Sequence, residues 1–139
     1  MTAPCTGINV AQPFFREEHL LGVSLVFHTK GKDKDHDTAL GIRVCNEDGI
    51  LVAEKTGITG HWIEKTSYLV SLDLKNSLVK AALFAGSVSL EIHPNGNDTW
   101  EFTYTMWMFF SDKTAIEKHW DEKALTQESA SSTDAWTES

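Results

Sequence analysis

The chain has 139 residues, of which 41% are hydrophobic, and a formal net charge of -8. This length suits one domain with a two-layer core and is too short for two such cores. The acidic balance excludes nucleic acid as the main partner, because phosphate binding needs clustered Lys and Arg side chains. The longest apolar run, residues 106–110, is far too short for a transmembrane segment.

Residues 1–19 contain Pro4 and Pro13 and show no sustained hydrophobic period, so we expect them to form an N-terminal arm. They lack the basic start and the apolar run of a secretory signal, which favours a cytoplasmic protein. The two cysteines, Cys5 and Cys45, allow one disulfide. A reduced pair agrees better with the expected location.

Between residues 20 and 112, hydrophobic and polar side chains alternate in several short runs, which is typical of half-buried β-strands. Asn95-Gly96 gives the strongest turn signal between two such runs. Residues 75–86 are rich in Ala, Leu and Lys and are expected to form a crossover with a helical turn. The sequence predicts an all-β domain over residues 20–112, an antiparallel two-sheet sandwich, with an open barrel as the alternative.

The remainder of the chain is expected to differ from the sandwich. Residues 113–124 predict a short C-terminal helix, because Thr114 and Glu117 have the spacing of a capping box and Ile116 and Trp120 would share one side. Residues 125–139 turn to Ser, Thr, Glu and Asp, which predicts a disordered acidic tail.

One face of the last predicted strand is apolar although it points away from the expected core. It carries Trp107 and Phe109 beside two threonines. We therefore expect either the arm around Phe14-Phe15 or the C-terminal helix to cover it.

Three aspartates alternate in the loop between the first two predicted strands. Carboxylates this close repel one another by about 1 to 4 kcal/mol per pair, which favours either hydration or a bound cation. If neighbouring strands run antiparallel and residues 75–86 add no strand, the turn at residues 95–98 reaches the same end. Calcium prefers oxygen ligands from such loops. The predicted calcium ligands are Asp33, Asp35, Asp37, Asn95, Asn97 and Asp98. The alternative is that these side chains are hydrated or accept backbone amides in their own turns.

A glycine-rich loop, residues 56–62, places Trp62 near its tip beside His61. The ring is expected either to close the end of the sandwich or to contact a membrane interface, a sugar or a peptide. Lys32 and Lys34 lie in the same loop as the three aspartates, where they would contact anionic head groups or simply aid solubility. The sequence has no nucleophile elbow, phosphate-binding glycine loop or Cys-x-x-Cys motif, so we do not expect an enzyme.

Two stretches resemble a PLAT domain: residues 23–29 with Asp37-Thr38 and residues 42–44, and later residues 86–93 followed by Asn97, Asp98 and Trp100. The resemblance spans about residues 20–112. It implies an eight-stranded sandwich that docks on lipid or protein, sometimes with calcium. It also implies that loop acids are ligands, here Asp33, Asp35, Asp37 and Asp98, and that loop aromatics are membrane anchors.

Our leading hypothesis from the sequence is a non-catalytic module that docks on a lipid or protein surface with calcium held in its loops. One alternative is a sandwich-type lectin that binds carbohydrate. Another is a structural or oligomeric subunit. The sequence fixes neither the ligand nor the oligomeric state.

Overall fold

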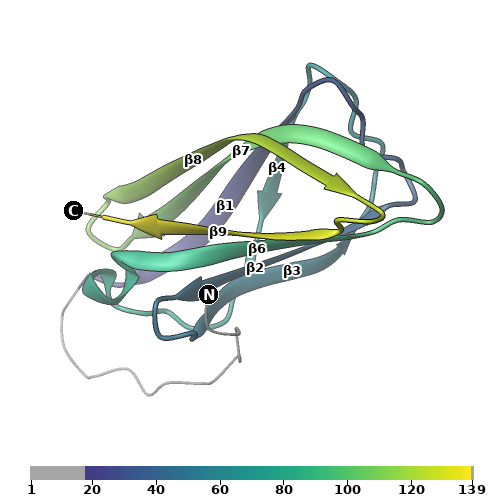
Figure 1. Cartoon of the computed structure of the whole chain (residues 1–139). Helices are drawn as coiled ribbons and strands as arrows, with labels where there is room; N and C mark the ends of the chain where they lie inside the picture. The colour runs from purple at the N-terminus through teal and green to yellow at the C-terminus, as the bar shows by residue number, and fades with distance from the viewer. Residues whose placement is uncertain (1–17, 139) are drawn as a thin grey trace.

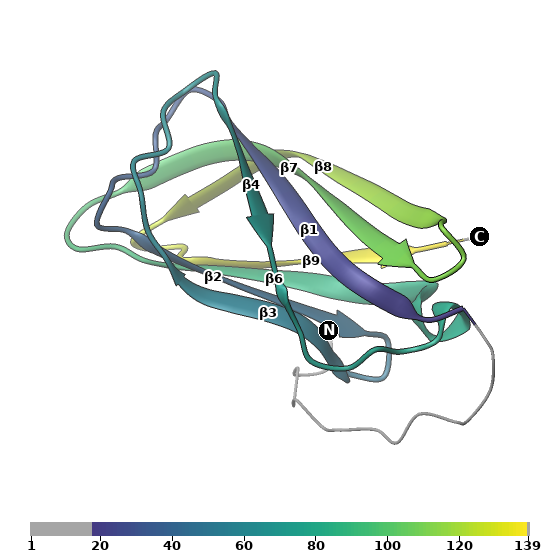
Figure 2. The ribbon, with the colours of Figure 1, turned by 180° about the vertical axis from the view of Figure 1, so that it is seen from behind.

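The computed structural model describes residues 18–138, which form two packed β-sheets (Figures 1 and 2). The strands in chain order are β1 (Leu20–Thr29), β2 (Ala39–Asn46), β3 (Leu51–Ile58), β4 (Ser67–Ser71), β5 (Asp73–Leu74), β6 (Ala85–His93), β7 (Thr99–Phe110), β8 (Ala115–Thr126) and β9 (Ser131–Thr137). The sheet orders are β4-β1-β7-β8 and β5-β3-β2-β6-β9. All ladders are antiparallel, which confirms the predicted two-sheet sandwich.

The core lies between the two sheets and is centred on β7. Every second residue of β7 from Trp100 to Phe110 is at most 2% exposed. Large side chains of this kind contribute roughly 1.5 to 3 kcal/mol each on burial. Phe27 of β1 contacts Trp100, Phe102 and Tyr104, with ring centroids 5.5 to 5.8 Å apart. The predicted alternation therefore identifies the core correctly.

The segment between β5 and β6 adds no strand. It contains one turn of 3-10 helix, η1 (Lys80–Leu83), as the composition of residues 75–86 predicts. No extra strand reverses the direction of the chain here. The β1–β2, β3–β4 and β6–β7 loops therefore meet at one end of the sandwich, opposite η1 (Figure 1). We call this end, residues 30–38, 59–66 and 94–98, the loop end.

The prediction of a short helix over residues 113–124 is wrong, because these residues form most of β8. Lys113 adopts a positive φ of 69° in the turn, and β8 then pairs with β7 as a hairpin. Ile116 and Trp120 still share one side, but Lys118 between them is also partly buried. Their spacing of four residues fits a strand as well as a helix.

The prediction of a disordered tail over residues 125–139 is also wrong. Residues 131–137 form β9, which pairs with β6, so the sandwich extends well beyond residue 112. The Trp136 ring is 4% exposed, and its Nε1 donates to the carbonyl oxygen of Leu83. It packs on Gly86, where an added Cβ would come within 2.4 Å of the ring. One tryptophan and one glycine thus anchor a strand that reads as polar.

A buried polar network joins β9 to the other sheet. The Tyr104 hydroxyl of β7 donates to Asp134 Oδ2 at 2.5 Å, and Lys123 Nζ of β8 lies 2.7 Å from Asp134 Oδ1. Burial, and then the hydrogen bond with Asp134, raise the pKa of Tyr104 above its usual range. The network therefore keeps the phenol protonated and closes the edge between the sheets.

Three further expectations concern the surroundings of the sandwich. Most of the predicted arm, including Phe14-Phe15, lies outside the described residues. Cys45 is 3% exposed and disulfide-bonded, so the prediction of reduced cysteines is wrong. A disulfide is more typical of an oxidising compartment, and the cytoplasmic location stays a prediction. Within residues 18–138, no helix has the length and apolar character needed to cross a membrane.

Candidate functional site

The loop end is organised around a buried lysine. Lys34 is fully buried, and its Nζ donates to three backbone carbonyl oxygens, those of Gly60 at 2.6 Å, Thr38 at 2.8 Å and Asp35 at 3.3 Å. Nζ also lies 4.9 Å from the centroid of the Trp62 ring, a cation–π distance. The chain therefore places its own ammonium group among the oxygens that converge here.

The aspartates of the loop end bind backbone and side-chain donors. Asp98 Oδ2 accepts from the Asp35 N–H at 3.1 Å and from the Thr38 hydroxyl at 2.6 Å. Asp33 faces a different loop, where it accepts from the Glu64 N–H at 2.7 Å and contacts His61 Nε2 at 3.2 Å. These contacts join different loops, whereas the alternative to a calcium site expected hydrated side chains or backbone contacts within each turn.

The structure brings only some of the predicted calcium ligands together. Asp35 and Asp98 meet at the loop end, as the alternating direction of consecutive strands predicts, whereas Asp33 turns to the β3–β4 loop. The side chains of Asp35, Asp37, Asn95 and Asn97 are exposed. Residues 18–138 contain no group of three or more His, Cys, Asp or Glu side chains placed to hold a metal ion.

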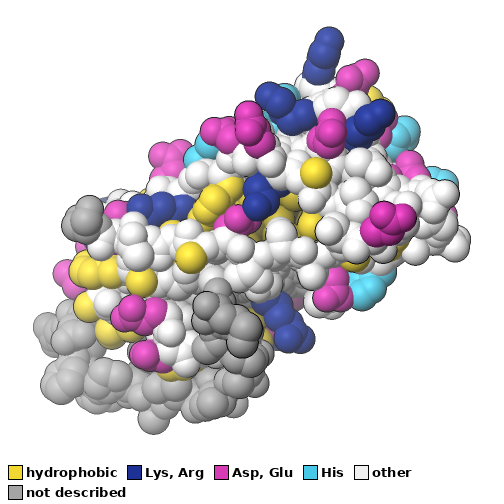
Figure 3. Space-filling model, in the orientation of Figure 1, with side chains coloured by type: hydrophobic (Ala, Val, Ile, Leu, Met, Phe, Trp, Pro, Cys, Tyr) yellow, Lys and Arg dark blue, Asp and Glu magenta, His cyan; other side chains and the backbone are white. Residues whose placement is uncertain are grey.

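The charges at the loop end act on Lys34. Burial lowers the pKa of Lys34 below its ordinary value of 10.5. Three negative charges oppose this shift, those of Asp98, Asp35 and Asp37. Figure 3 shows Lys and acidic side chains intermixed at the upper end of the molecule, where these loops lie. Three of the predicted ligands therefore serve as counter-charges of a lysine.

The four residues predicted to contact a ligand or a membrane differ in exposure: two are buried and two are exposed. Trp62 is 5% exposed and stacks on Tyr68, with centroids 4.9 Å apart, so it closes the end of the sandwich. Trp62 and Lys34 are both buried, so their predicted contact with a membrane stays a prediction that this arrangement does not support. His61 and Lys32 remain exposed.

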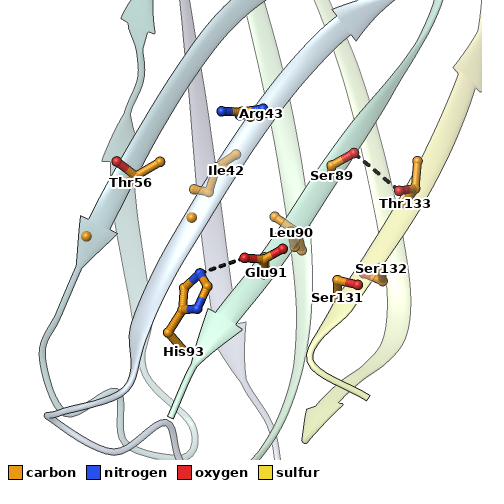
Figure 4. Close-up of a pocket in the computed structure, with 12 residues that line it drawn as sticks. Ile42, Arg43, Thr56, Ser89, Leu90, Glu91, His93, Ser131, Ser132 and Thr133 are labelled. Atoms are coloured by element: carbon orange, nitrogen blue, oxygen red, sulfur yellow. Dashed lines mark hydrogen bonds and ion pairs between the residues drawn. The ribbon is translucent and has the colours of Figure 1, made fainter. Parts of the chain in front are cut away.

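A hollow of about 560 Å³ lies on the outer face of the five-stranded sheet (Figure 4). Its floor is the backbone around Gly41 of β2 and Gly57 of β3, where no side chain fills the space. Across the ladder, Gly41 is opposite Glu91, and Glu91 is opposite Ser131 of β9. We call this the Gly41 hollow.

The walls of the Gly41 hollow carry hydroxyl groups and paired charges. The hydroxyl side chains that face the hollow are Thr56, Ser89, Ser131 and Thr133. Arg43 Nε lies 3.1 Å from Glu54 Oε2, and His93 Nε2 lies 2.6 Å from Glu91 Oε1. Ser132 lines the hollow only beside these groups, because it lies opposite the buried Leu90 and its Oγ is buried. The hollow thus offers both hydrogen-bond donors and hydrogen-bond acceptors, and its walls carry little net charge.

Sequence reasoning missed the Gly41 hollow because β9 supplies one of its walls. Residues 131–133 were assigned to a disordered tail. The available signal was the glycine at residue 41, at an outward position of β2, where the pairing with β3 also shifts register. Glycine in a strand interior often marks a bulge or a close approach by a ligand or another backbone.

The opposite sheet carries a chain of hydroxyl, imidazole and carboxylate groups. Thr105 Oγ1 lies 2.6 Å from His119 Nδ1, and His119 Nε2 lies 2.8 Å from Asp121 Oδ1. At Thr105, β7 pairs with both β1 and β8, so its backbone N–H groups are used in the ladders and form no oxyanion hole. The Asp121 side chain is 70% exposed, which leaves it well hydrated. We interpret this chain as surface hydrogen bonding.

No protein-family model, curated protein or solved structure matches this chain. The resemblance to PLAT domains therefore stays a prediction from the sequence. The site must be argued from its geometry.

Proposed function

We propose that this protein is a non-catalytic binding module that holds an uncharged carbohydrate in the Gly41 hollow. The observation that carries the proposal is the lining of the hollow, in which hydroxyl side chains surround a floor of bare backbone. A sugar presents the complementary surface, with hydroxyl groups around its edge and C–H groups on its faces. The walls contain both hydrogen-bond donors and acceptors. They match the hydroxyl groups of a sugar, because a hydroxyl group both donates and accepts hydrogen bonds.

The charges of the hollow favour an uncharged ligand. Arg43, the only Lys or Arg in the lining, is already engaged by Glu54, so an anion would have to displace that carboxylate. Glu91 Oε1 lies 2.6 Å from His93 Nε2, so this carboxylate also has a partner within the lining. A phosphate or carboxylate ligand would also meet the field of an acidic chain. A neutral polyol avoids both penalties.

The size and polarity of the hollow fit the same ligand class. About 560 Å³ lies within the range of small-molecule sites, roughly 300 to 1,000 Å³. Among residues 18–138 no Phe, Tyr or Trp side chain lines it, so the described lining offers no stacking surface for a nucleobase. The sugar would instead lie with its C–H face over Gly41 and its hydroxyls toward Ser89 and Thr133. These two hydroxyls are already 3.2 Å apart.

This proposal takes up the lectin alternative and needs no calcium. The loop end supports calcium-assisted docking less well, because Lys34 already supplies a positive charge to its oxygens.

The proposal is tested by calorimetric titration with a panel of free hexoses, N-acetylhexosamines and their short oligomers. Each titration is run with added calcium and with a chelator. We expect at least one sugar to bind equally in both conditions, and Gly41→Val to abolish that binding by filling the floor. The matched control is Gly22→Val on β1 of the other sheet, where an added Cβ meets nothing within 4 Å.

Two outcomes would refute carbohydrate binding in the hollow. One is the absence of binding across the whole panel. The other is binding that Gly41→Val leaves unchanged, which would place the sugar elsewhere. Binding that disappears with the chelator would instead return support to the calcium-dependent loops.

A further inference from the structure

The outer face of the four-stranded sheet is uncharged across three of its strands. The outward positions of β4, of β1 and of β7 from Thr103 to Phe109 contain no Asp, Glu, Lys or Arg. Asp, Glu, Lys and Arg make up 23% of the whole chain, which is strongly acidic. An exposed face of an antiparallel sheet is normally polar. Depletion of charge over a face this broad is typical of the centre of a protein interface.

The same face carries a continuous apolar stripe. Leu69 of β4 is 68% exposed and lies opposite Val26 of β1. Val26 is diagonal to Trp107 of β7, because Ser24 is the residue opposite Trp107. Phe109, two residues further along β7, is 45% exposed. The helix that the sequence predicted over this face is β8, which continues the sheet beside β7, so among the described residues nothing lies over the stripe. The alternative cover, the arm around Phe14-Phe15, lies outside the described residues.

We propose that a second copy of this chain covers the face, as a two-fold symmetric dimer in which the two four-stranded sheets pack against each other. Four strands about 4.8 Å apart and about 33 Å long present roughly 600 Å² per copy, or about 1,200 Å² in a pair. This is the lower limit of specific interfaces, about 1,200 Å². The uncharged outward positions of β1 and β7 lie at the centre of this face and would oppose each other without repulsion, although the chain as a whole is acidic.

The charges on β8 select the orientation of the two copies. Glu117, His119 and Asp121 form a polar rim along this edge of the face. A two-fold axis parallel to the strands places β8 of one copy opposite β4 of the other, whose outward residues are Ser67, Leu69 and Ser71. An axis across the strands would place the acids of β8 against themselves, which is unfavourable. We therefore assign the axis to the strand direction.

A lipid surface is the competing occupant, and the charges disfavour it. The described residues of the rim, on β8, include two acids and one histidine. An anionic membrane attracts clusters of Lys and Arg, which this rim lacks. The dimer is independent of the carbohydrate proposal, because the Gly41 hollow lies on the other sheet and stays open to solvent in this arrangement.

The test is sedimentation velocity of the full chain over a concentration series, repeated for Leu69→Glu and Phe109→Lys. We expect the wild type to dimerise, and each variant to weaken association by about 100-fold, because a two-fold interface buries each introduced charge twice. The glutamate at residue 69 would also face Glu117 and Asp121 of the second copy. Phe84→Lys is the matched control. Phe84 is 47% exposed at the end of η1, away from the face, and its replacement should leave the dimer intact. Circular dichroism confirms that each variant is folded.

Ser71 of β4 is exposed, and Ser71→Asp provides a third variant if either apolar residue proves necessary for folding. A wild type that stays monomeric at all concentrations overturns the proposal. So does a dimer that persists in the folded face variants, because its interface would lie elsewhere. Co-sedimentation of a monomer with phosphatidylserine vesicles would identify the lipid surface as the occupant and would also overturn the dimer.

Discussion

The loop end and the Gly41 hollow both gather polar side chains from several strands, but they differ in where those side chains find their partners. At the loop end, Lys34 and Asp98 bind backbone groups of the chain itself. In the hollow, hydroxyl groups surround a floor that has no side chain. The loop end therefore stabilises the fold, whereas the hollow is free to bind a ligand. Ser89 and Thr133 bond to each other in the hollow, but each hydroxyl has one donor and two acceptor positions and so keeps capacity for a ligand.

The largest expected effect is that of Lys34→Met, which tests whether the loop end is structural. Removing the ammonium leaves three carbonyl oxygens and the Asp98 carboxylate without their cation. Loss of one partner of a buried charge cluster costs about 3 to 5 kcal/mol. We expect a loss of this size in the free energy of unfolding, measured by urea denaturation.

The control is Lys32→Met, two residues away in the same loop but exposed, which should change stability by less than about 0.5 kcal/mol. Equal effects of the two substitutions would show that Lys34 is not the centre of the loop end.

Asp98→Ala should produce the second largest loss, about 2 kcal/mol. It leaves the Asp35 N–H and the Thr38 hydroxyl without their acceptor, and an unpaired buried donor costs about 1 to 3 kcal/mol. The same urea experiment on Asn97→Ala, an exposed neighbour, gives the reference. If both variants unfold at the same urea concentration, the carboxylate of Asp98 has no structural role.

The pH dependence of stability should be smaller and should isolate the ammonium of Lys34. Burial lowers its pKa in the folded state, so between that value and 10.5 the unfolded chain binds more protons at this residue. Stability then rises with pH in this window. Measured in urea, the stability of the wild type relative to Lys34→Met should increase as the pH approaches 10.5. A decrease would mean that Asp98, Asp35 and Asp37 outweigh burial and raise the pKa.

The alternation of hydrophobic residues was enough to predict the two-sheet sandwich and its centre at β7, because strand period and burial are both local properties of the sequence. The alternating direction of consecutive strands also predicted that Asp35 and Asp98 would meet at one end of the sandwich. The terminal strands were missed for physical reasons. Ile116 and Trp120 fit either a helix or a strand, and β9 is anchored by the packing of Trp136 on Gly86, two residues far apart in the sequence.

The site was harder to predict than the fold, because it depends on which residues become neighbours across strands. The burial of Lys34 requires carbonyl groups from two loops at once, and nothing in the acidic loop itself distinguishes Lys34 from Lys32. The Gly41 hollow requires β9 beside β6, so the error in the tail concealed it.

Gly41→Val is expected to have the smallest effect on stability. It tests whether the floor of the hollow, unlike the loop end, is dispensable for the fold. A Cβ at residue 41 would lie 3.7 Å from Thr56 Cγ2 and 3.8 Å from the Glu91 carbonyl oxygen, which are ordinary contacts. Valine favours the strand conformation, whereas glycine weakens a strand by about 0.5 to 1 kcal/mol. The free energy of unfolding should therefore stay the same or rise by up to about 1 kcal/mol, while sugar binding is lost. A fall as large as that of Asp98→Ala would show that the glycine is needed for the fold, and the floor of the hollow would then be structural in the same sense as the loop end.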